Sequence, residues 1–395
     1  MRASAAFNRL LPLLGVLVAG ACTPVQESGS PAAGVAVGEI LGGGSAAGYE
    51  RALEPRPFDF PSDHGPHPGF RNEWWYLTGN LEGRNGEAFG FQLTFFRIAL
   101  APPGAMPAGR SSKWATDQLY MAHFALSDVS GGTFHAFERF RRPALGLAGA
   151  QARPFAVWLD DWRLEGPKDG EEPWPLRLQA AEDGAGLDLS LTDVGGRVLQ
   201  GDRGHSPKGP GIGNASFYYS YPSLEARGTV AAAGREVEVE GTAWLDREWS
   251  TSALGDGVVG WDWFSLQLDD GRSLMLYRLR RRDGSQDPWS DGTLVDADGS
   301  AHRIEMKKVR LQELDHWRAD DGVRYPSRWR LSLPNEALEL TVLPRLADQE
   351  LRLTVRYWEG AVTVSGTSRG NPVAGAGYVE LTGYSGRESP AETGG

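Results

Sequence analysis

Residues 241–278 read GTAWLDREWSTSALGDGVVGWDWFSLQLDDGRSLMLYR, and this stretch decides the fold. Its first five residues have the pattern of a strand end. Residues 261–268 alternate aromatic or apolar side chains with polar ones, as a strand with one buried face does. An Asp-Asp-Gly turn at 269–271 leads into a returning strand at 274–278. The stretch therefore predicts antiparallel strands joined by tight turns.

The composition of the whole chain favours the same fold class. Its 395 residues include 52 Gly and 25 Pro, which suit turns, and 14 Trp, 11 Tyr and 15 Phe, which suit strands. We find no long stretch whose apolar side chains recur with a helical period, so helices should be few and short. Short alternating strands at close spacing are typical of a barrel or a sandwich, and this length allows two domains. The prediction is an all-β fold.

The charge of the chain argues against nucleic acid as a partner. The formal net charge is −11, whereas phosphate binding needs clustered Lys and Arg side chains. The one notable basic run, at 278–282, fits a solvated strand end better than a binding surface.

The N-terminus has the pattern of an export signal. A positive start precedes a short apolar core at 10–18, too short to span a bilayer as a helix. Cys22, the one cysteine of the sequence, follows Ala-Gly-Ala and resembles the lipidated cysteine of a bacterial lipoprotein; the alternative is an ordinary export signal with an incidental cysteine. Because Thr23 follows, rather than Asp, we expect a cell-envelope lipoprotein anchored in the outer membrane and facing the periplasm. The predicted leader is 1–21, and a Gly-, Ala- and Ser-rich tether follows at 22–52.

A second aromatic hairpin, at 71–97, resembles the one at 261–278. Each opens with two tryptophans, turns through acidic residues and glycine, and closes with an aromatic residue followed by arginine. This pattern indicates a weak internal repeat of two related barrels, although chance similarity between aromatic hairpins is the alternative. The predicted domains are 53–212 and 213–386, with a disordered tail at 387–395.

The C-terminal third carries more alternating segments. We predict strands near 351–358, 361–365 and 377–383. Glu359-Gly360 reads as a short turn between the first two of these strands.

The segment Asp246-Arg247-Glu248-Trp249 places four functional side-chain types in one corner. Tryptophan has a large apolar face and one N–H donor, so a group of tryptophans suits an apolar pocket with a few polar groups. The alternative is that the tryptophans are plain core and the charged residues form a structural ion-pair network at a barrel rim. The sequence leaves both interpretations open.

Three histidines are candidate site residues. His64 and His67 lie three apart in a Pro-containing loop and could form a metal pair or a site entrance, but loop histidines bonded to the backbone are commoner and no third ligand is near. His123 shares a strand face with apolar neighbours, which is more typical of a bonded core histidine than of a catalyst. We find no Gly-x-Ser-x-Gly elbow and no phosphate loop.

Eight segments carry a family resemblance. They are EWWYLTGNL, FQLTFFR, AHFALSD, FYYSYPSL, AWLDREWS, GWDWFSLQLDDGRSLMLYR, YWEGAV and GYVELTGY, in this order within residues 55–385. They are similar to bacterial AttH-like proteins of the carotenoid 1,2-hydratase (CrtC-like) superfamily, a group often labelled predicted secreted hydrolases. The resemblance implies two tandem lipocalin-like (calycin-type) antiparallel β-barrels, with an apolar cavity at or near their interface.

The resemblance also implies a chemistry without a cofactor. Relatives act on or bind apolar molecules, and a protonated carboxylic acid or tyrosine in an apolar pocket can protonate a carbon–carbon double bond. Aromatic faces then stabilise the carbocation, and water adds. The chain departs from the hydratases where Arg247 replaces the histidine of an Asp-His-x-Trp motif and where Arg278, after Tyr277, replaces an acid. These departures put the carotenoid activity in doubt.

Two functions follow from these observations. A third possibility is a purely structural lipoprotein without a cavity. The favoured one is binding of an apolar ligand such as a lipid or isoprenoid, with ABC-type export permeases as possible partners through the resemblance. The expected ligand-binding residues are Glu73, Trp74, Trp75, Tyr76, His123, Tyr218, Tyr219, Trp249, Trp261 and Trp263. The alternative is a hydratase, isomerase or hydrolase. In it Asp246 or Glu248 is the acid, Arg247 orients it or binds an anionic group, and Tyr277 assists.

Overall fold

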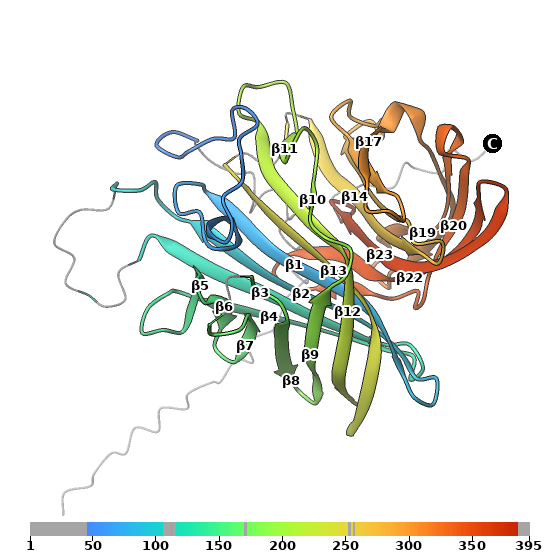
Figure 1. Ribbon diagram of the computed structural model, residues 1–395, viewed down its shortest axis with the longest axis horizontal. Coiled ribbons are helices and arrows are strands. Elements are labelled where there is room, and N and C mark those ends of the chain that lie inside the picture. The colour runs from blue at the N-terminus through green and yellow to red at the C-terminus, as the bar shows by residue number, and fades with distance from the viewer. Residues whose placement is uncertain are drawn as a thin grey trace, which may run out of the picture. The chain divides into compact units, whose positions relative to one another are not determined.

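Two antiparallel sheets make up the computed structural model (Figure 1). It describes residues 46–105, 112, 116–169, 172–251, 254–255 and 257–385. The predicted leader, the lipidation of Cys22 and the predicted tail lie outside these residues. Within them, no helix has the length and apolar character needed to cross a membrane.

The first sheet has the strand order β4-β3-β2-β1-β13-β12-β9-β8-β7-β6-β5, and the short strands β10 and β11 pair with β12. The bounds are β1 Asn72–Gly83, β2 Ala88–Ala99, β3 Gln118–Asp128, β4 Thr133–Arg141, β5 Ala148–Ala152, β6 Phe155–Leu159, β7 Trp162–Glu165, β8 Leu176–Glu182, β9 Ala185–Asp193, β10 Val198–Leu199, β11 His205–Pro207, β12 Ala215–Ala232 and β13 Arg235–Ser250.

The second sheet has the order β17-β16-β15-β14-β23-β22-β20-β19-β18, and β21 pairs with β22. The bounds are β14 Val258–Leu268, β15 Ser273–Arg281, β16 Asp291–Val295, β17 Ala301–Glu305, β18 Arg310–Arg318, β19 Arg324–Leu333, β20 Leu338–Pro344, β21 Glu350–Arg352, β22 Arg356–Ser368 and β23 Asn371–Thr382. The described residues also form three 3₁₀ turns, η1 Ser62–His64, η2 Met306–Lys308 and η3 Pro334–Glu336.

The two sheets share one topology. In each, the first strand pairs with the second strand on one side and with the last strand on the other: β1 lies between β2 and β13, and β14 lies between β15 and β23. Both sheets are barrel-like: one is nearly closed and the other is a half-barrel. The predicted all-β fold of tandem lipocalin-like units is confirmed, and the two aromatic hairpins occupy equivalent positions.

The boundary between the two sheets differs from the expected one. The predicted second domain includes 213–250, but β12 and β13 belong to the first sheet. β13 pairs with β1 along its length, from Asn72 opposite Ser250 to Gly83 opposite Val239. Because β13 satisfies the backbone groups on the free edge of β1, the break between the sheets falls after Ser250.

The start of the fold also lies earlier than the predicted end of the tether at 52. The hydroxyl of Tyr49 donates to the carbonyl of Ala99 at 3.2 Å, and the amide of Glu50 donates to the carbonyl of Gly69 at 2.8 Å. Ala52 is fully buried in the first core. These contacts attach 49–52 to the folded chain.

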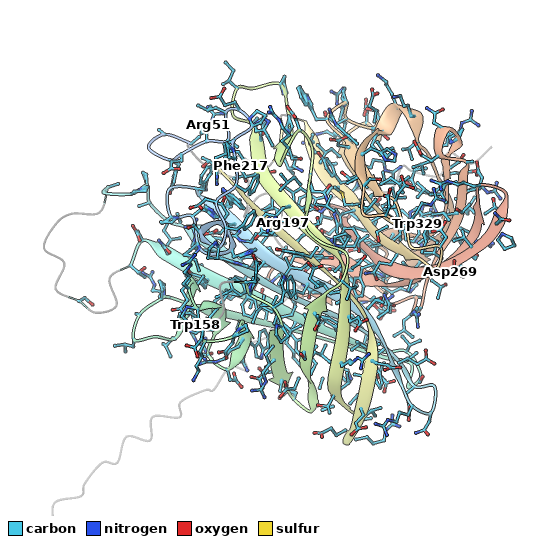
Figure 2. All side chains as sticks on the ribbon, viewed as in Figure 1. Arg51, Trp158, Arg197, Phe217, Asp269 and Trp329 are labelled. Atoms are coloured by element: carbon cyan, nitrogen blue, oxygen red, sulfur yellow. The ribbon has the colours of Figure 1, made fainter. Side chains whose placement is uncertain are left out.

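Each sheet encloses its own apolar core, as the filled interiors in Figure 2 illustrate with Phe217 in the first and Trp329 in the second. Two further apolar clusters lie between the sheets. One of them joins Tyr76 and Tyr218 of the first sheet to Trp263 of the second. The strand β1, residues 215–222 of β12 and residues 243–250 of β13 are therefore buried on both faces, one toward the first barrel's interior and one toward the second sheet.

Candidate functional site

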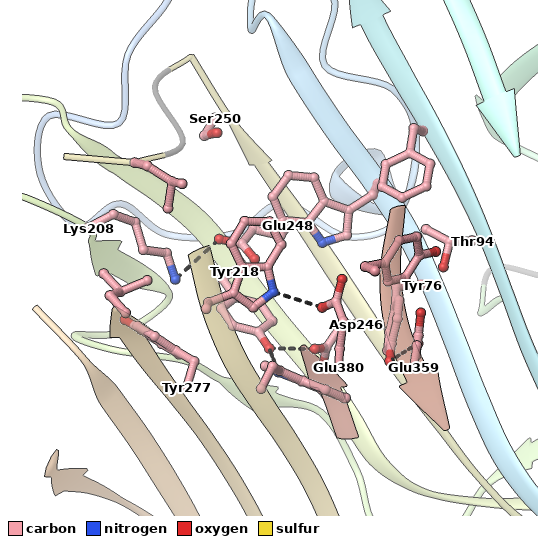
Figure 3. Close-up of a pocket in the computed structure, with 17 residues that line it drawn as sticks. Tyr76, Thr94, Lys208, Tyr218, Asp246, Glu248, Ser250, Tyr277, Glu359 and Glu380 are labelled. Atoms are coloured by element: carbon pink, nitrogen blue, oxygen red, sulfur yellow. Dashed lines mark hydrogen bonds and ion pairs between the residues drawn. The ribbon is translucent and has the colours of Figure 1, made fainter. Parts of the chain in front are cut away.

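A cavity lies between the two sheets, lined by strands of both (Figure 3). Its aromatic lining consists of Trp74, Tyr76, Phe96, Tyr218, Trp261, Trp263, Tyr277 and Tyr357. The space open to the centres of water-sized molecules is about 100 Å³. One water molecule needs about 10–15 Å³ of such volume, so the cavity has room for an organic group as well as water.

Strand alternation divides the predicted site residues into two sets, because successive side chains point to opposite faces. The cavity is lined by Trp74, Tyr76, Tyr218, Asp246, Glu248, Trp261, Trp263 and Tyr277. The interior of the first barrel receives Glu73, Trp75, Tyr219, Arg247 and Trp249. The sequence predicts both sets at one site, and the structure brings the first set, but not the second, to this cavity.

Glu73 is the centre of a buried ionic network inside the first barrel. Its carboxylate accepts hydrogen bonds from Arg97 Nε, from Arg247 Nη2, and from the His67 amide at 3.0 Å. Although burial disfavours its charged form, the guanidinium groups of Arg97 and Arg247 hold the pKa of Glu73 well below its usual range. Arg247 therefore belongs to a structural ion-pair network, the alternative that the sequence left open.

The histidines have protein partners. His64 Nδ1 lies 2.7 Å from the Tyr219 hydroxyl, while the His67 ring stacks on Trp249 at a centroid distance of 3.8 Å. His123 Nδ1 lies 2.8 Å from the hydroxyl of Tyr357, a residue of the cavity wall. His123 itself does not line the cavity, although a ligand contact is predicted for it. It is connected to the cavity wall by its hydrogen bond with Tyr357.

Asp246 is the main carboxyl group that the first sheet contributes. Its Oδ1 accepts from Ser220 Oγ at 2.5 Å and from Trp244 Nε1 at 2.7 Å, and its Oδ2 accepts from the Tyr218 hydroxyl. Burial raises the pKa of Asp246 to about 7, although these three donors act in the opposite direction. A carboxyl group with a pKa near neutrality can both give and take a proton at physiological pH.

The second sheet contributes two carboxyl groups that the sequence analysis missed. Glu359 on β22 and Glu380 on β23 are directly opposite in the strand register. The Tyr76 hydroxyl donates to Glu359 Oε1 at 2.5 Å, and Trp261 Nε1 donates to Glu380 Oε2 at 2.8 Å. Burial raises the pKa of Glu380 to about 7, and burial together with the charge of Glu380 raises the pKa of Glu359 well above its usual range.

Glu359 was assigned to a turn, and that prediction is wrong. β22 runs through Glu359-Gly360 without interruption. Gly360 is needed there for space, because a Cβ at this position would lie 2.3 Å from the side-chain amide of Gln349. The acidic-Gly pair imitates a turn sequence, yet the signal for a functional acid was present, since Glu359 and Glu380 both lie in segments that carry the family resemblance.

At the other side of the cavity, Lys208 Nζ lies 3.4 Å from Glu248 Oε1. The Ser216 hydroxyl also donates to Glu248, and the hydroxyl groups of Tyr277 and Ser206 are 3.1 Å apart. Burial favours the neutral amine, but Glu248, Tyr277 and Asp291 together outweigh burial and raise the pKa of Lys208. Lys208 was not among the predicted site residues, because it lies in a polar loop without a motif.

A cavity between two lipocalin-like sheets, with aromatic walls and buried carboxyl groups, defines a two-unit lipocalin-like protein with an internal site. The chain belongs to the AttH-like family, whose model matches residues 51–384. It is similar to the crystal structure of a protein of Nitrosomonas europaea described as AttH, with 38% identity, a TM-score of 0.73, and coverage of 85% of this chain and 99% of that one. The predicted family resemblance is thereby confirmed.

Two solved structures of lower identity share the fold. Kievitone hydratase from Nectria haematococca is 16% identical with a TM-score of 0.63, over 85% of this chain and 98% of that one. CghA, solved with Sch210972, is 14% identical with a TM-score of 0.52, over 89% of this chain and 98% of that one. No curated protein sequence matches the chain.

Proposed function

We propose that the chain is an enzyme that protonates a carbon–carbon double bond of an apolar substrate in the cavity between the sheets, leading to hydration or isomerisation. The observation that carries the proposal is the set of three buried carboxyl groups on an aromatic wall: Asp246, Glu359 and Glu380. Burial raises the pKa of each, so that protonated carboxyl groups persist near neutral pH. A buried carboxylic acid of this kind is the usual form of a general acid.

The reaction balances with groups that line the cavity. A carboxyl group gives its proton to one carbon of the double bond, which leaves a carboxylate and a carbocation. The faces of Trp74, Trp261 and Trp263 stabilise the positive charge. In hydration, water adds to the cation and its surplus proton returns to the carboxylate. In isomerisation, the carboxylate removes a proton from a neighbouring carbon instead.

The buried acids favour catalysis over binding alone. An apolar ligand gains little from carboxyl groups, and burying a polar group without full pairing lowers stability. Glu359 is in such a position: it accepts from Tyr76 and lies near Tyr357, but a second buried carboxyl group, Glu380, is directly opposite it. The fold is also shared with a protein named as a hydratase. These observations support catalysis, whereas the sequence slightly favours a binding role.

An apolar-ligand carrier is the second candidate, supported by the eight aromatic side chains of the wall. In that case the proposed setting is an outer-membrane lipoprotein, anchored through Cys22 and facing the periplasm, that serves an ABC-type export permease. The mass of the mature N-terminus tests the anchor, because lipidation adds acyl chains to a chain that begins at Cys22.

Proton transfer to carbon separates the two candidates. The protein is incubated in D₂O with its copurifying apolar molecules and with unsaturated isoprenoids and fatty acids, and the products are analysed by mass spectrometry. We expect deuterium at carbon or addition of water with the wild type, and a loss of about 100-fold or more in Asp246→Asn and Glu380→Gln with ligand uptake retained. Uptake without any deuterium at carbon in the wild type would assign the cavity to binding.

A further inference from the structure

The cavity has two chemically different sides. In Figure 3, Lys208 and Tyr277 lie on one side, Tyr76 and Glu359 lie on the other, and Asp246 lies between them. The side of Glu359 carries a carboxyl group that burial keeps neutral. The side of Lys208 carries an ammonium group beside the Glu248 carboxylate. A molecule that spans the cavity therefore meets a cation at one end and protonated acids at the other.

The ammonium group of Lys208 is held in place without being saturated. Lys208 is 9% exposed, and its Nζ lies 3.4 Å from Glu248 Oε1 and 3.8 Å from the centre of the Tyr277 ring. A charge-assisted hydrogen bond between nitrogen and carboxylate is about 2.7–2.9 Å long, so the contact with Glu248 is loose. An ammonium group has three N–H donors, and its contacts here are one carboxylate oxygen and two aromatic rings, the second being that of Tyr218 at 5.4 Å. An aromatic ring is a weaker acceptor than an oxygen atom, so a ligand oxygen can still bind to the ammonium group.

Other buried cations make shorter contacts with oxygen atoms, although one guanidinium nitrogen of Arg97 and one of Arg280 also lack a partner among the described residues. Arg97 donates to the carbonyls of His67 and Phe70 at 2.8 and 2.7 Å, and Arg280 donates to Asp262 at 2.8 Å. Those arginines lie away from the cavity and connect strands. Lys208 instead lines the cavity, where a loosely paired cation adds little to stability. Its position is better explained by a ligand than by the fold.

We propose that Lys208 binds an oxygen acceptor of the substrate, so that the substrate class is amphipathic: an unsaturated apolar skeleton with one carboxylate, carbonyl or hydroxyl oxygen. The inference rests on the proposed function in taking this cavity as the substrate site. Glu248 and Asp246 are alternate residues on one face of β13, roughly 7 Å apart along the strand. An oxygen on Lys208 therefore places a double bond several bonds away against Asp246.

Three probes with one C10 skeleton test the inference: geranic acid, geraniol and the hydrocarbon 2,6-dimethyl-2,6-octadiene. Their affinities are measured by quenching of tryptophan fluorescence, because Trp74, Trp261 and Trp263 line the cavity. We expect Lys208→Met to weaken geranic acid about tenfold or more and to leave the hydrocarbon within about twofold, since the lost contact is a charged hydrogen bond. Lys208→Arg should recover part of the loss.

The outcomes are distinct. Weakening of geranic acid alone shows that the oxygen group is anionic, and weakening of geraniol as well shows that a neutral oxygen suffices. Equal effects on all three probes, or none, overturn the inference, and unchanged hydrocarbon binding shows that the variant is folded. If no probe binds the wild type, both this inference and the proposed function fail. Binding that depends on Lys208 without deuterium at carbon overturns only the proposed function.

Discussion

Asp246 and Arg247 are consecutive residues of β13, and their side chains lie on opposite sides of the first sheet. Asp246 faces the cavity and accepts from the Tyr218 hydroxyl, while Arg247 faces the barrel interior and donates to Glu73. Arg247 also donates to the carbonyls of Trp74 and Glu248, at 3.3 and 3.2 Å. One strand thus carries the proposed acid on one face and, on the other, the network that holds its backbone.

Removing Arg247 should destabilise the fold. Arg247→Met leaves Glu73, which is fully buried, with Arg97 as its remaining arginine partner. Breaking a buried ion pair on one side costs about 3–5 kcal/mol, because the other charge stays buried. We expect that loss in urea unfolding, and a large part of it should be recovered in the double variant Glu73→Gln/Arg247→Met. An unchanged unfolding midpoint in the single variant would show that the network adds nothing to stability.

The raised pKa of Asp246 predicts a pH-dependent difference in stability. Burial raises this pKa from 3.8 to about 7, so between these pH values the folded chain binds a proton more tightly than the unfolded chain. A rise in pH through this window therefore lowers the free energy of unfolding, by on the order of 3–4 kcal/mol. Asp246→Asn removes this dependence.

The other titrating groups are the same in the wild type and in Asp246→Asn, so the difference between the two proteins reports the titration of Asp246 alone. Free energies of unfolding at pH 4, 5.5 and 7 should show the wild type falling relative to Asp246→Asn, with little further change above about pH 7.5. Parallel curves for the two proteins would mean that the Asp246 carboxyl titrates normally in the folded state.

The sequence could predict the strands but not the face to which each side chain points. The two aromatic hairpins alternate visibly, and the acid at 246 follows from the motif. However, β1 and residues 243–250 of β13 are buried on both faces, so polarity does not distinguish the cavity face from the barrel interior. Trp74 and Trp75 look alike in the sequence, yet one lines the cavity and the other packs in the core.

Glu359, Glu380 and Lys208 could not be predicted as site residues for a different reason. Glu359 and Glu380 meet Asp246 only because the second sheet packs on the first, and no local pattern encodes a contact across more than a hundred residues. Lys208 reaches the cavity from a loop without alternation. The family segments contained both glutamates, so the resemblance was informative where strand patterns were not.

Tyr218 should tune the acid without being required for it. Its hydroxyl donates to Asp246, and that bond lowers the pKa of Asp246 against the larger effect of burial. Tyr218→Phe keeps the ring, removes the donor, and should raise the pKa of Asp246 further, by about one unit for one charged hydrogen bond. The alkaline limb of the pH–rate profile should move to higher pH by the same amount. Ser220→Ala is a second test of the same effect. Ser220 also donates to Asp246, so its loss should move the alkaline limb in the same direction. A limb that stays in place in both variants would mean that another group supplies the proton.

The two sheets approach each other closely at Gly90 and Ala361. A Cβ at Gly90 on β2 would lie 2.5 Å from the Cβ of Ala361 on β22, closer than two carbon atoms can pack. Gly90→Ala should therefore push the sheets apart and destabilise the protein by about 1–3 kcal/mol, as overpacking does.

Ala361 lies two residues after Glu359 on the same face of β22, so the displacement should also disturb the hydrogen bond between Tyr76 and Glu359 and lower turnover. Ala361→Gly in the Gly90→Ala background removes the clash and should restore both properties, whereas Ala361→Gly alone should have a small effect. Thermal unfolding and the deuterium assay measure the two effects together. If Gly90→Ala proves neutral or stabilising, the two sheets do not touch at this point.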